Sequence, residues 1–267
     1  MKFTTKQLDQ YRNEGYTTAP EFFDRDEIAA MRAELERFKK EGLLNNVATL
    51  GDGKTPSTAG VNLQICPIAP KSDLFRSLGF AAKVVESIRQ LIGDPFIWQL
   101  DQIFLKPGRH GKGTSWHQDN AYFRIRDRRQ GVGMWTAVHA ANVDNGTMQV
   151  IPRGDAELLA HERDAGSNHH IKCVVDESKA VPIELPAGGV LFFNYAVPHC
   201  TTGNNTDHER AGLALHFMRE EAIINDNRLA IVTGPNATHG VKEFGKDQRG
   251  LWEQQVKEAN HHALAHA

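Results

Sequence analysis

The sequence predicts a mainly β protein with flanking helices, whose core is a sandwich or jelly roll. Helical patterns are confined to the first 93 residues and to the tail. After Asp94 the chain changes to short β-rich segments separated by Gly and Pro turns, which is typical of these antiparallel architectures. The segments follow one another too closely for the crossover helices that a parallel sheet needs. We therefore expect the helices to buttress one face of the β core.

The clearest helix begins at Asp24, which can cap it, with Glu27 three residues later as in a capping box. Apolar residues then recur at helical spacing: Ile28, Met31, Leu35 and Phe38. Gly42 ends this helix. A shorter helix is expected over residues 5–13 and a third over about 81–92, whose buried side carries Val84, Val85, Ile88 and Leu91.

Six segments have strand character. They are residues 96–105, 133–143, 147–151, 181–185, 190–194 and 211–218. Residues 43–60 are rich in Gly, Thr, Asn and Ser and are expected to form a long loop. This loop and the one at 120–131 are the two candidates for a lid. The tail, residues 250–267, is predicted to be a terminal helix, and we expect it to be solvated.

Composition excludes several classes of protein. The 267 residues are 40% hydrophobic and 24% charged, with a formal net charge of −2, so charge gives no support for a nucleic acid or an anionic membrane as partner. No apolar run approaches the ~18 residues of a membrane span, and the N-terminus lacks the apolar region of a secretion signal. The cysteines, Cys66, Cys173 and Cys200, lack CxxC spacing, which favours reduced thiols in a cytoplasmic protein.

The most informative stretch is Trp116-His117-Gln118-Asp119-Asn120. On an extended strand, residues two apart point to the same face, so His117 and Asp119 would aim an imidazole and a carboxylate at one point. A third ligand from a distant strand would complete the two-His, one-carboxylate triad of non-haem Fe(II) oxygenases. With 13 histidines in the chain, the His-x-Asp pair alone is a weak signal.

A distant segment supplies the missing parts. His199 follows the strand expected over 190–194, and Arg210 lies eleven residues later, at the start of the next strand. A buried arginine there would hold the far carboxylate of a dicarboxylic co-substrate, because its planar guanidinium makes bidentate contacts that lysine cannot.

This pattern resembles the phytanoyl-CoA dioxygenase family of 2-oxoglutarate oxygenases. The surrounding motifs agree with it: Phe104-Leu105-Lys106-Pro107, His117-Gln118-Asp119 with Tyr122-Phe123, Trp135-Thr136-Ala137, and Asp144-Asn145-Gly146 leading to Pro152-Arg153-Gly154. The likeness covers roughly residues 5–220, and several separated motifs in the right order are far more specific than any one of them.

The resemblance implies a double-stranded β-helix, a jelly-roll, cupin-like core. It places the iron ligands on His117, Asp119 and His199, and the clamp for the 2-oxoglutarate carboxylate on Arg210. Further co-substrate contacts would fall on Gln102, Trp135, Thr201 and Gln64. The sequence provides a separate reason to expect Thr201 in contact with the co-substrate. It lies two residues beyond His199, on the same face of an extended segment, and its hydroxyl can donate a hydrogen bond.

The expected activity is hydroxylation of an unactivated C–H bond with Fe(II), 2-oxoglutarate and O2, releasing succinate and CO2. Relatives that halogenate carry Gly or Ala where this chain has Asp119, so the carboxylate favours hydroxylation or a related oxidation such as desaturation. The substrate is expected to be a small polar or anionic metabolite; an acyl-CoA or a natural-product scaffold is the alternative. The basic run at 124–129 could meet an anionic substrate, although a solvated loop is the default for such a run.

Rival classes are a cupin-like metal-dependent hydrolase or isomerase, a non-catalytic binding barrel and a structural zinc protein. The first needs no dicarboxylate clamp, the second predicts a lost ligand, and the third needs cysteine spacing that the chain lacks. We expect one domain over 1–267: a helical buttress and lid (1–93), a β-helix core (94–220) and a C-terminal extension (221–267). It would take a small-molecule substrate, bind neither nucleic acid nor membrane, and be a monomer or homodimer.

Four residues near these motifs have plainer interpretations. Trp116 is expected to be a core aromatic, and Cys200 a small buried residue that faces away from the metal. His139 and His216 are expected to be core histidines whose polar atoms have partners. For His216, which would share a strand face with Arg210, a place behind the metal ligands is the alternative.

Overall fold

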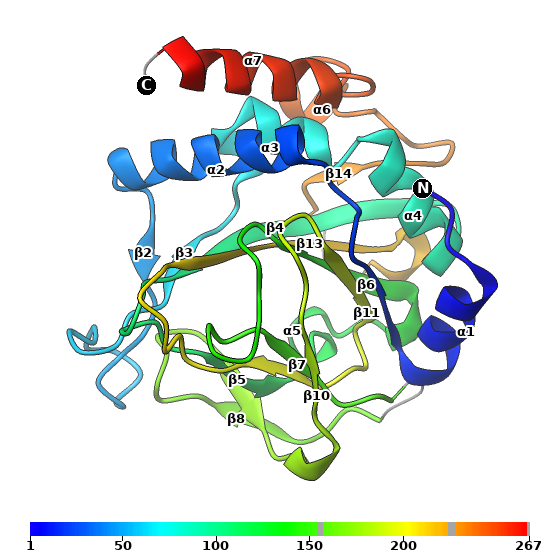
Figure 1. The fold of residues 1–267 in the computed structure, drawn as a ribbon. Helices are drawn as coiled ribbons and strands as arrows, with labels where there is room; N and C mark the ends of the chain where they lie inside the picture. Colours follow the sequence, from blue (N-terminus) through cyan, green and yellow to red (C-terminus); the bar gives the residue numbers. More distant parts are fainter. Residues whose placement is uncertain (154–156, 224–227, 266–267) are drawn as a thin grey trace.

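Two antiparallel sheets face each other in the computed structural model, which describes residues 1–153, 157–223 and 228–265 (Figure 1). The larger sheet has the order β1-β11-β6-β13-β4-β3-β2, with β14 also paired to β4. Its strands are β1 (Tyr16–Ala19), β2 (Asn45–Asn46), β3 (Leu63–Ile65), β4 (Phe96–Lys106), β6 (Gly131–Ala137), β11 (Val190–Asn194), β13 (Arg210–Arg219) and β14 (Ala230–Ile231).

The smaller sheet has the order β10-β7-β12-β5 and supplies the opposite wall of the core. Its strands are β5 (Thr114–His117), β7 (Met148–Val150), β10 (Val181–Ile183) and β12 (His199–Thr201). A separate hairpin joins β8 (His161–Arg163) to β9 (Ile171–Cys173). Every pair among these strands is antiparallel, so the prediction against a parallel sheet is confirmed for the described residues.

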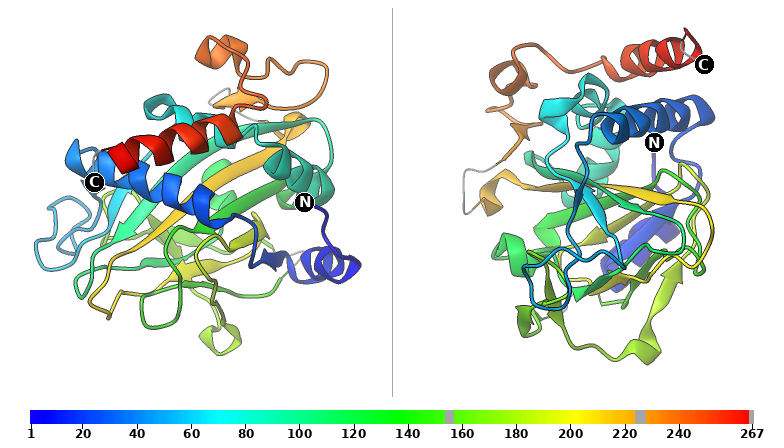
Figure 2. Two further views of the ribbon diagram at one scale, coloured as in Figure 1. Left: turned by 45° about the horizontal axis from the view of Figure 1, so that its top comes forward. Right: turned by 90° about the vertical axis from the view of Figure 1, so that its left-hand side faces the viewer.

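Helices cover the outer face of the larger sheet, as expected (Figures 1 and 2). The covering helices are α2 (Arg25–Lys40), α3 (Asp73–Leu78), α4 (Ala82–Ile92) and α7 (Trp252–Ala265). Of the other described helices, α1 (Thr5–Glu14) lies beside β1, the short α6 (Val241–Phe244) precedes α7, and α5 (Asn120–Phe123) follows β5 and lies between the sheets. The predicted capping box is present: Glu27 N–H donates to Asp24 Oδ1 at 2.9 Å, and Asp24 N–H donates to Glu27 Oε2 at 2.8 Å. None of the described helices combines the length and the apolar character that a membrane crossing needs.

One predicted strand ends early. The segment expected over 133–143 leaves the larger sheet at Ala137, because the next residues turn toward the smaller sheet. Val138 N–H already donates to Ala211 O across this corner, and Ala141 then bridges Leu185, beyond the end of β10. The chain thus passes from one sheet to the other here, as a β-helix requires.

The expectation of a solvated tail is wrong for the inner face of α7. Trp252 is 1% exposed and Val256 6% exposed, and both belong to the main hydrophobic core. Figure 2 shows α7 lying alongside α2. The indole Nε1–H of Trp252 donates to the buried Glu27 carboxylate at 2.6 Å, which fixes the helix to the buttress.

Glu27 joins three helices, because its carboxylate also accepts from Lys83 Nζ on α4 at 2.6 Å. We propose that the chain folds as one cooperative unit, and Glu27→Ala tests this. We expect the free energy of unfolding to fall by about 2–4 kcal/mol in a single transition, since a buried donor and cation lose their partner. The control is Glu36→Ala on the same helix, whose exposed pair with Lys39 should contribute less than ~1 kcal/mol. The free energy of unfolding of each variant is measured by urea unfolding. An equal decrease in the two variants, or a separate early transition in Glu27→Ala, would contradict the proposal.

Candidate functional site

Two histidines face each other across neighbouring strands. His117 is the last residue of β5 and His199 the first of β12, and the antiparallel register pairs them directly. Their ring centroids are 4.2 Å apart. This pairing explains how residues 82 positions apart in the sequence reach one point.

Asp119 reaches the same point by a different route from the predicted one. The expectation of a single extended strand through His117 and Asp119 is wrong, because β5 ends at His117. Asp119 has helical backbone angles, φ −59° and ψ −31°, and stands at the N-terminus of α5. A tight turn therefore carries its carboxylate back toward the two imidazoles.

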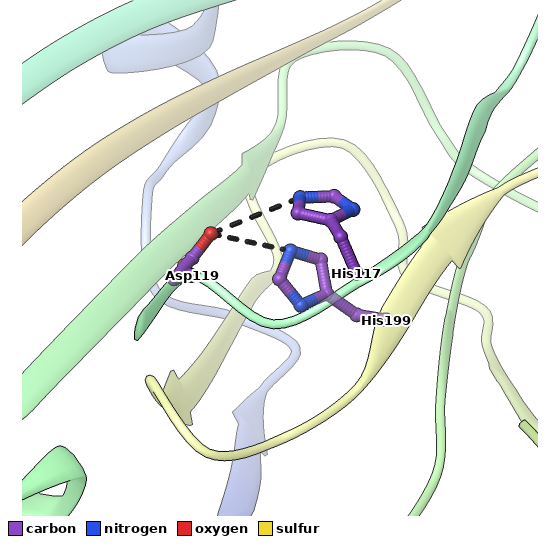
Figure 3. A group of neighbouring side chains, drawn as sticks. All are labelled: His117, Asp119 and His199. Atoms are coloured by element: carbon purple, nitrogen blue, oxygen red, sulfur yellow. Dashed lines mark ion pairs between the residues drawn. The ribbon is translucent and has the colours of Figure 1, made fainter. Parts of the chain in front are cut away.

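The three side chains converge on one oxygen atom (Figure 3). Asp119 Oδ1 lies 3.8 Å from His117 Nε2 and 3.6 Å from His199 Nε2. One ligand atom from each residue lies within 4.8 Å of the other two. Such a group is the donor set of a 2-His-1-carboxylate metal site.

The hydrogen bonds behind the imidazoles prepare them for a metal. His117 Nδ1 lies 2.8 Å from Ser115 O, and His199 Nδ1 lies 3.0 Å from Val197 O. A carbonyl only accepts, so each Nδ1 carries the proton and each Nε2 keeps its lone pair. Burial lowers the pKa of His117 to about 3 and that of His199 to about 4, which keeps both rings neutral. Asp119 Oδ2 is buried without a hydrogen-bond partner among the described residues, so the three side chains together still lack a polar partner that a metal site would normally have.

These residues form part of the wall of a cavity of about 360 Å³ between the sheets. All eight residues singled out from the sequence line it, and the structure thus brings them together: Gln64, Gln102, His117, Asp119, Trp135, His199, Thr201 and Arg210. Gln64 Nε2–H donates to Gln102 Oε1 at 2.7 Å. Thr201 Oγ1 accepts from Thr114 N–H at 3.0 Å, which leaves the hydroxyl proton free to donate into the cavity.

Arg210 is a buried cation at the start of β13, only 1% exposed. Its Nη2–H donates to Gly146 O, its Nε–H donates to Asn145 O at 3.4 Å, and its guanidinium carbon lies 5.6 Å from the centre of the Trp135 ring. Burial lowers its pKa to about 10, so it stays charged at neutral pH. Within the described parts of the chain, no carboxylate pairs with it. An anion entering the cavity would supply the missing partner.

The sequence analysis missed Lys106 as a site residue, although a signal was present. Gln102, Phe104 and Lys106 alternate along β4 and all line the cavity, as residues on one face of a strand must. Lys106 is buried, and its Nζ donates to Gly146 O at 3.2 Å, the same carbonyl that Arg210 contacts. His169 and His170 also line the cavity, from the loop between β8 and β9, and no sequence pattern indicated them.

The basic run at 124–129 contributes nothing to the cavity wall as the structure describes it. Arg129 instead pairs with Asp127 at 3.0 Å on the surface. Tyr122 and Phe123, just before the run, do line the cavity. The run thus fits the default expectation of a solvated loop.

Of the four residues that were expected to have no catalytic role, Trp116 and His139 are as predicted, Cys200 is so in part, and His216 is not. Trp116 is a core aromatic, as predicted, and packs with Cys200 and Ile151. Cys200 is buried as expected but also lines the cavity. His139 accepts from Ala211 N–H at 3.1 Å and is partnered, as predicted. His216 lines the cavity with no hydrogen-bond partner at either ring nitrogen, so the expectation of a satisfied histidine is wrong.

Comparison with known proteins places this geometry in a wider context. Residues 11–212 match the family model described as phytanoyl-CoA dioxygenase (PhyH). Ectoine dioxygenase of Stutzerimonas stutzeri is 25% identical over 227 residues, which are 77% of this chain and 74% of that protein.

Solved structures confirm the fold. EctD from S. alaskensis with 2-oxoglutarate and 5-hydroxyectoine is similar with a TM-score of 0.64 and 21% identity, covering 82% of this chain and 77% of that one. The epimerase SnoN in complex with Fe3+, alpha ketoglutarate and nogalamycin RO has a TM-score of 0.65 and 21% identity, covering 80% of this chain and 82% of that one. The two facing sheets are therefore the double-stranded β-helix that the sequence analysis expected.

Proposed function

The chain belongs to the phytanoyl-CoA dioxygenase family of iron- and 2-oxoglutarate-dependent oxygenases, and we propose that it hydroxylates an unactivated C–H bond of a small metabolite, with Fe(II) held by His117, Asp119 and His199. The observation that carries the proposal is the convergence of two neutral imidazoles and one carboxylate oxygen on a buried point. Three ligands on one side of a metal leave three positions for co-substrate and O2.

The residues present fit an iron ion. Both Nε2 lone pairs and Asp119 Oδ1 point at one place, and neither ring needs to lose a proton to bind. When bound, iron supplies the O2 chemistry that converts 2-oxoglutarate to succinate and CO2 and oxidises the substrate. Since a carboxylate occupies position 119, the proposal is oxygen insertion and not halogenation.

The rest of the cavity supports 2-oxoglutarate as co-substrate. Arg210 would pair with its C5 carboxylate, because two N–H groups are anchored on carbonyls while the guanidinium still lacks an anionic partner in the described chain. Thr201 would donate its hydroxyl beside that carboxylate. Trp135 would shape the wall against the arginine, and the Gln64–Gln102 pair would contact the co-substrate from β3 and β4.

The size of the cavity supports a small substrate. About 360 Å³ lies near the lower end of the range, ~300–1,000 Å³, of small-molecule sites, and 2-oxoglutarate would share it. Among the described residues, the wall carries one fixed cation, Arg210, and one buried lysine, Lys106, whose pKa is held well below its usual value by burial and by the nearby Arg210. Both lie at the Gly146 end. If the co-substrate carboxylate neutralises Arg210, the substrate side favours a polar metabolite over an anionic one.

The test is a turnover screen with Fe(II) and 2-oxoglutarate, measuring succinate release and O2 consumption. We expect succinate to form in step with O2 use and to rise when the right compound is present, among small polar metabolites sooner than among acyl-CoAs. A cupin-like hydrolase or isomerase would form no succinate. Absence of succinate from protein that has bound iron would overturn the proposal.

A further inference from the structure

His216 is an unpartnered polar group aimed at the metal site. It is 3% exposed, and its Nδ1 lies 3.5 Å from Asp119 Oδ2. Neither ring nitrogen has a hydrogen-bond partner among the described residues, and Asp119 Oδ2 has none either. A buried histidine and a buried carboxylate oxygen thus face each other, each without another partner, which folded proteins normally avoid.

The strand explains why His216 is there. Arg210, Ala214 and His216 share one face of β13 and all line the cavity, so the strand carries the co-substrate clamp at one end of the site and His216 toward the other. The ring is held between aromatic neighbours, with its centroid 5.2 Å from that of Phe123 and 6.0 Å from that of Tyr195. It therefore has a fixed position relative to Asp119.

The two oxygens of Asp119 have different surroundings. Oδ1 faces both metal-binding imidazoles, whereas among the described residues Oδ2 has an ion-pair contact with His216 alone. We propose that His216 is a positioning residue for Asp119: its Nδ1–H donates to Oδ2 and so restricts the carboxylate to one metal-facing oxygen. This inference rests on the proposed function, because it needs a metal at the triad.

The consequence concerns the number of open positions. A carboxylate that bound the metal through both oxygens would take one of the three positions left for co-substrate and O2. Closing the gap from 3.5 Å to the usual ~2.9 Å of an N–H···O bond needs a shift of only about 0.6 Å. Groups behind a metal ligand commonly contribute about 10–100-fold to metal affinity.

The experiment measures Mn(II) affinity by electron paramagnetic resonance, without co-substrate or turnover. His216→Leu removes both ring nitrogens, and we expect the Kd for Mn(II) to rise about 10–100-fold. His216→Asn places an amide N–H where Nδ1 stands and should recover most of the affinity. His216→Gln places its amide near the position of Nε2 and should not.

The matched control is Thr136→Val on the adjacent strand β6. Thr136 is fully buried with an unpartnered hydroxyl, like His216, but it does not line the cavity, so its Mn(II) affinity should equal that of the parent. Equal affinity for the Asn and Gln variants, or a Leu variant within twofold of the parent, would overturn the inference. If His216→Leu does not fold, the Asn–Gln comparison still decides.

Failure of the proposed function has a different signature. The parent should bind one Mn(II), and His199→Ala should lose it. If the parent binds none, or if His199→Ala binds as tightly as the parent, the metal site itself is wrong, whatever the His216 variants do.

Discussion

Replacing His199 by alanine should lower turnover of 2-oxoglutarate by more than about 100-fold, since even groups behind a ligand contribute 10–100-fold. The physical reason is the loss of one of three donors that the fold brings to a single point. His199 is buried at the start of a strand pair, and its Nδ1 is fixed by Val197 O, so no neighbouring ligand replaces it without moving β12.

The control for this variant is His208→Ala, an exposed histidine outside the cavity wall. Its turnover should match the parent. Iron content per chain should be measured beside succinate formation, so that a lost metal is distinguished from a lost fold. A His199→Ala protein that retains both iron and normal turnover would remove this residue from the site.

Arg210→Lys should raise the 2-oxoglutarate concentration needed for half-maximal turnover by roughly 10–100-fold, because a charge-assisted bidentate contact becomes a single-point contact. Lysine keeps the charge but not the planar pair of N–H groups. The Gly146 and Asn145 carbonyls, which now accept from the guanidinium, also lose donors. Maximal turnover at saturating 2-oxoglutarate should change less, because the contact is with the carboxylate remote from the metal.

The chain offers a matched control on the same strand. Arg219 ends β13, lies outside the cavity wall and contacts Asp94 O and Glu221. Arg219→Lys should leave the 2-oxoglutarate requirement unchanged. An unchanged requirement in Arg210→Lys, or the same change in both variants, would show that Arg210 does not bind the co-substrate.

The metal triad and Arg210 could be predicted because residue type and spacing together indicate their chemistry. Two histidines, one aspartate and one arginine at these intervals are typical of an Fe(II) site with a clamp for a dicarboxylate. The backbone at Asp119 was not predictable, because the rule for an extended strand does not reveal that β5 ends two residues earlier. Lys106 was predictable from β4, because it lies on the same face of that strand as Gln102, which was already expected to line the site.

Other features depend on partners far away in the sequence. The short strands β8 and β9 exist because they pair with each other, and three residues carry little pattern of their own. The burial of Trp252 depends on Glu27, 225 residues earlier. The role inferred for His216 depends on which atoms face its ring, and residue type alone cannot tell a partnered histidine from an unpartnered one.

One measurement tests the central claim most directly: an anaerobic titration of Fe(II) into the protein with 2-oxoglutarate, followed by the weak visible charge-transfer band of the chelated co-substrate. The proposed site predicts one iron per chain, a band that is absent in His199→Ala, and a band that needs more 2-oxoglutarate in Arg210→Lys. A parent protein that binds no iron, or a band of equal strength in His199→Ala, would contradict it.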